Sequence, residues 1–230
     1  FDVINIQEEW NKPTERENRM HCIHAYPAKF PAFITTMAIQ KAEQKNIKVD
    51  TVADIFCGCG TVAFEAVRSG KNFWGCDINP VATLIAKVKS QVYNDAILEE
   101  YFDEIVSSFK TSIADKNNII YANERVKYWF DEAQIDDLLK LRSAIYRNVK
   151  NEYYLRFFLC AFSNILKSCS RWLTKSIKPQ IDPDKCPKNV IAAFSAQVKM
   201  MRIANSENKM GGLGNADIHC LNFLEAKIEN

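Results

Sequence analysis

The sequence lacks long apolar runs, a secretory leader pattern and any large net charge. Lys or Glu interrupts every apolar stretch before it reaches the roughly 18 residues of a membrane-spanning helix. Thirty Lys plus Arg against 28 Asp plus Glu give a formal net charge of +2, so a nucleic-acid surface would have to be a local patch. We therefore expect a globular, cytoplasmic protein with no membrane contact.

Two further absences restrict the chemistry. The chain has no G-x-x-x-x-G-K-[ST] segment, which argues against hydrolysis of nucleoside triphosphates. Its eight cysteines are scattered through apolar segments, which is typical of a protein in a reducing compartment. Cys57 and Cys59 are one residue apart, whereas structural zinc sites favour C-x₂₋₄-C pairs. We therefore expect no metal site.

Strand-like and helix-like segments alternate over residues 51–90. The apolar runs TVADIF and NFWGCDI have the length of buried strands, and the segments that follow them have helical periodicity. Pro80 stands where the first turn of a helix tolerates proline. This alternation predicts an α/β fold in which parallel strands are joined by right-handed crossovers and carry helices on both faces.

In the rest of the chain, a helix-rich region separates the first two strand-like runs from a third. Residues 94–173 are rich in helix-forming segments, a further helix-like run follows from 190 to 204, and ADIHCLNF near the C-terminus is strand-like again. We expect three regions: residues 1–93 with the first half of the fold, a large and mainly helical insertion over 94–205 with a possible role in DNA contact, and residues 206–230 with the third strand.

The strongest chemical signal is DIFCGCGT, at the junction of a predicted strand and helix. Glycines allow a sharp turn and close approach to a ligand, and the following helix supplies unpaired amides. The next strand ends in Asp77, about 20 residues on, and an acid there suits ribose hydroxyls. The pattern predicts a nucleotide-like cofactor. Because the broader dinucleotide fingerprint allows Ala63, a nicotinamide-dependent dehydrogenase remains an alternative.

Three segments resemble the amino-directed DNA methyltransferases, in the order expected for that family. DIFCGCGT resembles their D-P-F-C-G-S-G-T motif, CDINPVA their second acidic motif, and HAYPAKFPAFI the H-x-Y-P-A-K-F-P segment that closes over the cofactor. Ile55 and Cys59 depart from the usual proline and serine. The resemblance implies a Rossmann-like methyltransferase sheet, S-adenosyl-L-methionine as cofactor, double-stranded DNA as partner, and a restriction-modification setting.

The resemblance also implies which residues meet the adenosine part of the cofactor. Phe56 would lie against the adenine ring, Asp77 would hold the ribose, and Asp217 and Ile218 would border the adenine. The full set of implied cofactor-binding residues is Tyr26, Ala28, Lys29, Phe30, Asp54, Phe56, Cys57, Gly58, Gly60, Thr61, Asp77, Ile78, Asp217 and Ile218.

The remaining implied contacts concern the methionine part. Gly58 and Gly60 would admit it, and Thr61 would bond its carboxylate. Asp54 would face its amino group, and residues 26–30 would cover this end of the cofactor.

A basic, proline-punctuated stretch over residues 171–188 is the candidate DNA surface. Lysine and arginine suit phosphate contacts, and Trp172 offers stacking nearby. Asp182 and Asp184 offset part of the charge, so a solvated face is the alternative. The candidate DNA-binding residues are Arg171, Lys175, Lys178 and Lys185.

The family's catalytic motif, [DNS]-P-P-[YFW], does not occur. The chain contains no Pro-Pro pair, and Pro80 and Pro183 are followed by Val and Asp. We expect the catalytic residues outside this chain, in a C-terminal portion or on a partner subunit that completes the enzyme. The alternative is a non-catalytic subunit of a split methyltransferase that binds cofactor or nucleic acid.

Overall fold

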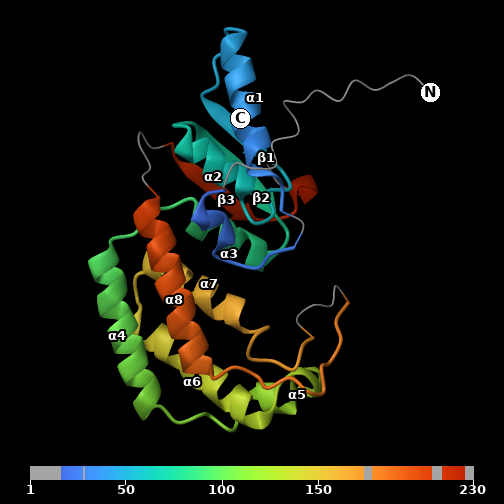
Figure 1. The fold of residues 1–230 in the computed structure, drawn as a ribbon, viewed down its shortest axis with the longest axis vertical. Helices are drawn as coiled ribbons and strands as arrows, with labels where there is room; N and C mark the ends of the chain where they lie inside the picture. The colour runs from blue at the N-terminus through green and yellow to red at the C-terminus, as the bar shows by residue number, and fades with distance from the viewer. Residues whose placement is uncertain (1–16, 28, 174–177, 209–213, 226–230) are drawn as a thin grey trace, which may run out of the picture. The chain divides into compact units, whose positions relative to one another are not determined.

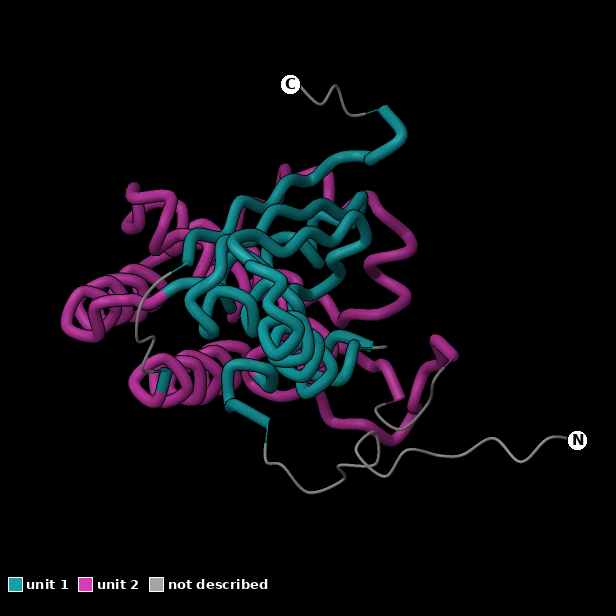
Figure 2. Tube along the Cα trace, turned by 90° about the horizontal axis from the view of Figure 1, so that it is seen from above, with its two compact units in different colours: residues 1–22, 26–91, 208–230 teal, residues 23–25, 92–207 magenta. Residues whose placement is uncertain are grey.

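The protein was analysed as a computed structural model that describes residues 17–27, 29–173, 178–208 and 214–225. The chain forms two compact units (Figure 2). Residues 1–22, 26–91 and 208–230 form the first, here called the sheet unit. Residues 23–25 and 92–207 form the second, here called the helical unit.

A parallel sheet organises the sheet unit (Figure 1). Its described strands are β1 (Thr51–Asp54), β2 (Asn72–Asp77) and β3 (Ala216–Cys220), in the order β1-β2-β3. Asp54 is in register with Gly75 of β2, and Asp77 with Cys220 of β3. The predicted α/β class with parallel strands is confirmed. Since parallel strands end at the same edge, the segments after β1 and β2 lie together there.

Short capping signals define the helices of the sheet unit. Asn79 accepts hydrogen bonds from the amides of Val81 and Ala82 and so begins α3, with Pro80 as its first residue. Small residues of α2, including Ala63 and Ala66, pack in the core. The helices are η2 (Arg19–Cys22), α1 (Ala32–Gln44), α2 (Thr61–Arg68), α3 (Pro80–Lys89) and η4 (Phe223–Glu225).

The helical unit contains no strand among the residues of it that the structure describes. Asn94, Asn123 and Asn151 each cap a helix by accepting backbone amides with their side chains. Apolar side chains at helical spacing bury one face of α7, including Phe157 and Phe158. The helices are α4 (Asp95–Thr111), η3 (Ile119–Ala122), α5 (Glu124–Trp129), α6 (Glu132–Asn148), α7 (Glu152–Ile165) and α8 (Val190–Glu207).

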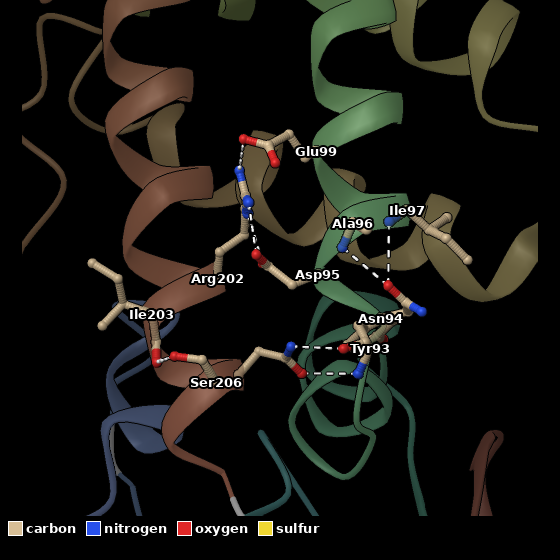
Figure 3. Close-up of polar contacts among 10 residues, drawn as sticks. Tyr93, Asn94, Asp95, Ala96, Ile97, Glu99, Arg202, Ile203 and Ser206 are labelled. Carbon is tan, nitrogen blue, oxygen red and sulfur yellow. Dashed lines mark hydrogen bonds and ion pairs between the residues drawn. The ribbon is translucent and has the colours of Figure 1, made fainter.

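Two polar contacts of different burial join α8 to the start of α4 (Figure 3). Asn205 is 4% exposed, and its side chain accepts from the Tyr93 amide at 2.8 Å and donates to the Tyr93 carbonyl at 2.9 Å. One helical turn earlier, Arg202 makes two hydrogen bonds of 2.7 Å to the more exposed Asp95. The hydrogen bonds from Arg202 hold the pKa of Asp95 below its usual value.

All eight cysteines are free thiols. Along the described parts of the chain, no helix is both long and apolar enough to span a membrane.

We predict that Asn205→Leu lowers the free energy of unfolding by about 2 to 4 kcal/mol, because it removes two buried hydrogen bonds at similar side-chain volume. Arg202→Leu is the matched control and should cost less than about 1 kcal/mol, since its ion pair is partly exposed to solvent. Urea denaturation followed by circular dichroism measures both. Equal losses would show that burial does not decide the strength of these contacts.

Candidate functional site

The segment between β1 and α2 forms a tight turn held by backbone hydrogen bonds. The Phe56 amide donates to the Asp54 carboxylate at 3.0 Å, and the Cys57 amide donates to the carbonyl of Cys76 on β2 at 2.9 Å. Gly58 and Gly60 have φ angles of +49° and +74°, in the left-handed region. Gly60 also lies against α3: a Cβ there would come within 2.5 Å of the Ala86 Cβ. The glycine pattern thus serves both the turn and helix packing.

Asp77 connects this turn to the end of β2. One carboxylate oxygen accepts the Gly58 amide at 3.0 Å, and the other accepts the Asn79 amide at 2.8 Å. A carboxylate has about four acceptor positions, so two remain for further donors such as hydroxyl groups. Asp77, which the sequence analysis singled out, therefore connects the two strand ends and still has acceptor positions for a ligand.

A cavity of about 480 Å³ opens beside the turn. This volume is within the usual range of small-molecule sites, roughly 300 to 1,000 Å³. It brings together most of the predicted cofactor residues and adds Pro31, Cys59 and Val62, which the sequence did not single out. Its lining residues are Tyr26, Lys29, Phe30, Pro31, Asp54, Phe56, Cys57, Gly58, Cys59, Thr61 and Val62.

Large apolar side chains are exposed around this edge of the sheet. Phe56, in the turn, is 80% exposed, and Ile78, directly after β2, is 73% exposed. Phe30, in the segment before α1, is 46% exposed. Apolar side chains gathered beside a concave site favour a ligand with an apolar or aromatic face.

Asn79 is a site residue that the sequence analysis did not assign. Its side-chain amide donates to the Tyr26 hydroxyl at 3.5 Å, while its own backbone amide is bound to Asp77. Burial, followed by the negative charge of Asp77, raises the pKa of Tyr26, so the phenol stays neutral and can donate a hydrogen bond. The position of Asn79 between an acid and Pro80 is a readable helix-cap signal, but nothing in it indicates the contact with Tyr26.

A buried polar pair fixes the segment that leads into the cavity. His21 Nε2 lies 2.8 Å from Glu65 Oε1 on α2, and both side chains are almost fully buried. The His21 ring also meets Phe64 edge-on, at 4.9 Å between ring centroids. The Lys29 ammonium donates to the His21 carbonyl, so a cavity residue is tied to this pair. The 44-residue separation of His21 and Glu65 left no sequence signal.

Cys57 of the turn is not suited to nucleophilic chemistry. Burial, aided by the charges of Asp54 and Asp77, raises the pKa of Cys57 to about 12, which keeps its thiol protonated. The Lys89 ammonium lies 3.6 Å from the sulfur of Cys59. Within the described ranges, no three His, Cys, Asp or Glu side chains gather as a metal site would require.

The structure does not bring Asp217 and Ile218 to the cavity. Asp217 is in register with Trp74, three residues before Asp77, and its carboxylate lies 2.8 Å from His219. Ile218 is 4% exposed and packs in the core. Both residues lie within β3, whereas Cys220 ends the strand in register with Asp77. Neither residue therefore lies at the strand end beside Asp77.

The candidate DNA residues are also arranged differently from the expectation. Arg171 donates to the carbonyls of Lys127 and Tyr128, each at 2.8 Å. Lys185 donates to two carbonyls as well, so both cations have structural partners. Lys178 is exposed. Lys175 and, in the cofactor set, Ala28 lie outside the described residues.

We predict that Gly60→Ala lowers the free energy of unfolding by about 2 to 4 kcal/mol, because the new methyl group meets Ala86 and the left-handed φ is strained. Gly58→Ala is the control: its Cβ would have nothing nearer than 4.0 Å, so only the cost of about 1 kcal/mol for the φ angle applies. Urea titration measures both. Equal losses of unfolding free energy in the two variants would contradict the close approach of Gly60 to α3.

Two curated relatives match most of the chain, and a family model matches its N-terminal part. The family model described as DNA methylase matches residues 2–88. Type II methyltransferase M.MvaI of Kocuria varians is 24% identical over 204 residues, covering 84% of this chain and 45% of the relative. Type II methyltransferase M.MjaII of Methanocaldococcus jannaschii is 31% identical over 203 residues, covering 88% of this chain and 30% of the relative.

The chain thus spans less than half the length of these two relatives. No solved structure matches it significantly. The region matched by the family model contains β1, the glycine turn, β2, Asp77 and most of α3. Through this region and its curated relatives, the chain belongs to the amino-directed DNA methyltransferase family.

Proposed function

We propose that this chain is the S-adenosyl-L-methionine-binding part of a DNA methyltransferase that modifies the exocyclic amine of adenine or cytosine. The observation that carries the proposal is Asp77, which bridges the glycine turn and the end of β2 beside the exposed Phe56 and Ile78. The Type II methyltransferase relatives support a restriction-modification setting and DNA as the substrate.

The residues at the strand ends fit the adenosine part of this cofactor. Asp77 has acceptor positions left for the ribose hydroxyls. Phe56 and Ile78 present exposed apolar surface that an adenine ring would cover, which supplies a reason for their exposure. Asp217 and Ile218 are left out of this contact because they lie within β3.

The cavity residues fit the methionine part. The glycine turn leaves room for close approach of the ligand, and Thr61 begins α2, whose N-terminal end favours a carboxylate. Asp54 supplies the negative charge that an ammonium group needs. Tyr26, Lys29 and Phe30 line the same cavity and would cover this end. The bound cofactor supplies an activated methyl group on a sulfonium centre.

Two alternatives receive less support. A nicotinamide cofactor would use the same acid and turn, but the matching family model is that of a DNA methylase. A non-catalytic subunit of a split methyltransferase agrees with the missing Pro-Pro pair. We also infer that the sheet is Rossmann-like and that residues 94–205 are a helical insertion between residues 1–93 and 206–230.

We predict that Asp77→Asn weakens binding of S-adenosylhomocysteine by about 10- to 100-fold, since a hydrogen bond to a charged group contributes about 1.5 to 3 kcal/mol. Asp50→Asn is the control, an exposed acid of the same unit that pairs with Lys48 on the surface. Isothermal titration calorimetry measures the affinity, and a thermal melt checks the fold. Unchanged affinity in folded Asp77→Asn would remove Asp77 from the site.

Phe56→Ala offers an independent test, because a side chain that is 80% exposed contributes little to folding. We expect at least a fivefold loss of affinity, about 1 kcal/mol, if the ring lies against adenine. Ile113→Ala is the matched control, since Ile113 is 93% exposed and belongs to the helical unit. Equal affinities for the two variants would contradict the adenine contact.

We predict further that the chain alone binds cofactor but transfers no methyl group. An exocyclic amine is a poor nucleophile because its lone pair is delocalised, so acceptors must hold its protons while the methyl group lies in line. The Pro-Pro-aromatic motif supplies these acceptors in the family, and this sequence has no Pro-Pro pair.

The assay is transfer of a tritiated methyl group to mixed-sequence DNA, with and without a longer chain or partner that carries the motif. Transfer should appear only with that complement. Robust transfer by the 230-residue chain would overturn this prediction and place the catalytic groups within it.

A further inference from the structure

A second cavity, of about 440 Å³, lies entirely within the helical unit. Among the residues that the structure describes, its wall contains three lysines and no acidic side chain. The lining residues are Ala25, Asn164, Ile165, Lys167, Ser168, Lys185, Cys186, Lys188, Ala193, Ala196 and Gln197. A concave surface with charges of one sign concentrates counter-ions of the other, so this cavity favours an anion.

Lys185 is the fixed cation of this wall. Its ammonium donates to the carbonyl of Lys167 at 2.9 Å and to that of Trp172 at 2.8 Å. Burial lowers the pKa of Lys185; Asp182 opposes this shift, and the nearby charges of Lys167 and Lys188 add to it. The ammonium groups of Lys167 and Lys188 are therefore each close enough to Lys185 to repel it, and an anion would relieve that repulsion.

Lys167 and Lys188 have no acidic partner in the part of the chain that the structure describes. Other lysines of the same unit do: Lys127 pairs with Glu124, and Lys140 with Asp137. The Lys167 ammonium lies 5.2 Å from the centre of the Trp172 ring, which stacks on Trp129. The ring orients Lys167 without neutralising its charge.

The backbone around Lys188 is also fixed. Its amide donates to the Ser168 carbonyl at 3.1 Å, and α8 begins two residues later at Val190. The positive end of the α8 dipole therefore lies near Lys188. Three residues of α8 line the same cavity, namely Ala193, Ala196 and Gln197.

The uncharged polar groups of the wall are engaged in internal hydrogen bonds. Gln197 donates to the Ile23 carbonyl and accepts from Asn164, each at 2.7 Å, and Asn164 accepts the Ala25 amide at 2.9 Å. The Ser168 hydroxyl donates to the Ile165 carbonyl. This leaves the ammonium groups as the principal ligands, and a lysine ammonium binds phosphate as a point charge.

We propose that this cavity binds a backbone phosphate of duplex DNA through Lys167 and Lys188. The inference rests on the proposed function for its choice of DNA. Lys185 is the cation that holds the wall together, and the contacting residues differ from the set expected from the sequence.

The test measures binding of the full chain to a fluorescein-labelled mixed-sequence DNA duplex by anisotropy between 50 and 200 mM KCl. In Lys167→Gln/Lys188→Gln, the slope of log K against log salt should become shallower by about 0.9, and affinity at 100 mM KCl should fall roughly 5- to 10-fold, since one phosphate contact contributes a slope of about −0.9. Lys167→Arg/Lys188→Arg keeps both charges and should retain the wild-type slope.

Lys127→Gln/Lys140→Gln is the matched control, because it changes the net charge equally and removes two lysines of the same unit, one exposed and one half-buried. Its slope should stay within about 0.5 of the wild-type value. Equal slopes for the two Gln pairs, or no DNA binding by the wild type, would overturn the phosphate site. Stronger competition by an RNA duplex than by the same DNA duplex would overturn the assignment to DNA.

Calorimetry with S-adenosylhomocysteine on the same proteins separates this inference from the proposed function. Cofactor binding with no lysine-dependent DNA binding would contradict only the phosphate site. Lysine-dependent DNA binding without cofactor binding would contradict the proposed function and leave the site standing.

Discussion

The carboxylate of Asp77 is the constraint on which the candidate cofactor site depends. It joins the Gly58 amide of the turn to the Asn79 amide at the start of α3. Asn79 in turn caps α3 and contacts Tyr26. One carboxylate fixes both strand ends, so the backbone that positions the exposed side chains of Phe56 and Ile78 is held in place. A preorganised surface of this kind loses little conformational entropy when a ligand binds.

Local chemistry could be read from the sequence, and long-range placement could not. The glycine turn, Asp77 and the cap before Pro80 are short signals whose meaning depends on neighbouring residues, and the structure has each of them in place. The place of Asp217 depends on the register of β3 against β2, which no local pattern defines. The hydrogen bonds from Lys185 to the carbonyls of Lys167 and Trp172 likewise could not be read from the sequence, because folding brings these groups together.

The helical unit has internal hydrogen bonds that fix residues 23–25 and a lysine-lined cavity of its own. Gln197 donates to the Ile23 carbonyl and Asn164 accepts the Ala25 amide, so residues 23–25 are held within this unit. Lys127 and Lys140 of the same unit pair with acids, whereas Lys167 and Lys188 have no acidic partner among its described residues, and a phosphate would supply that negative charge.

The central claim is that the site beside Asp77 takes S-adenosyl-L-methionine and not another nucleotide cofactor. Parallel calorimetric titrations of the wild-type chain with S-adenosylhomocysteine and with NAD test it most directly. The account predicts saturable one-to-one binding of S-adenosylhomocysteine and no measurable heat with NAD. Saturable binding of NAD, with none of S-adenosylhomocysteine, would contradict it.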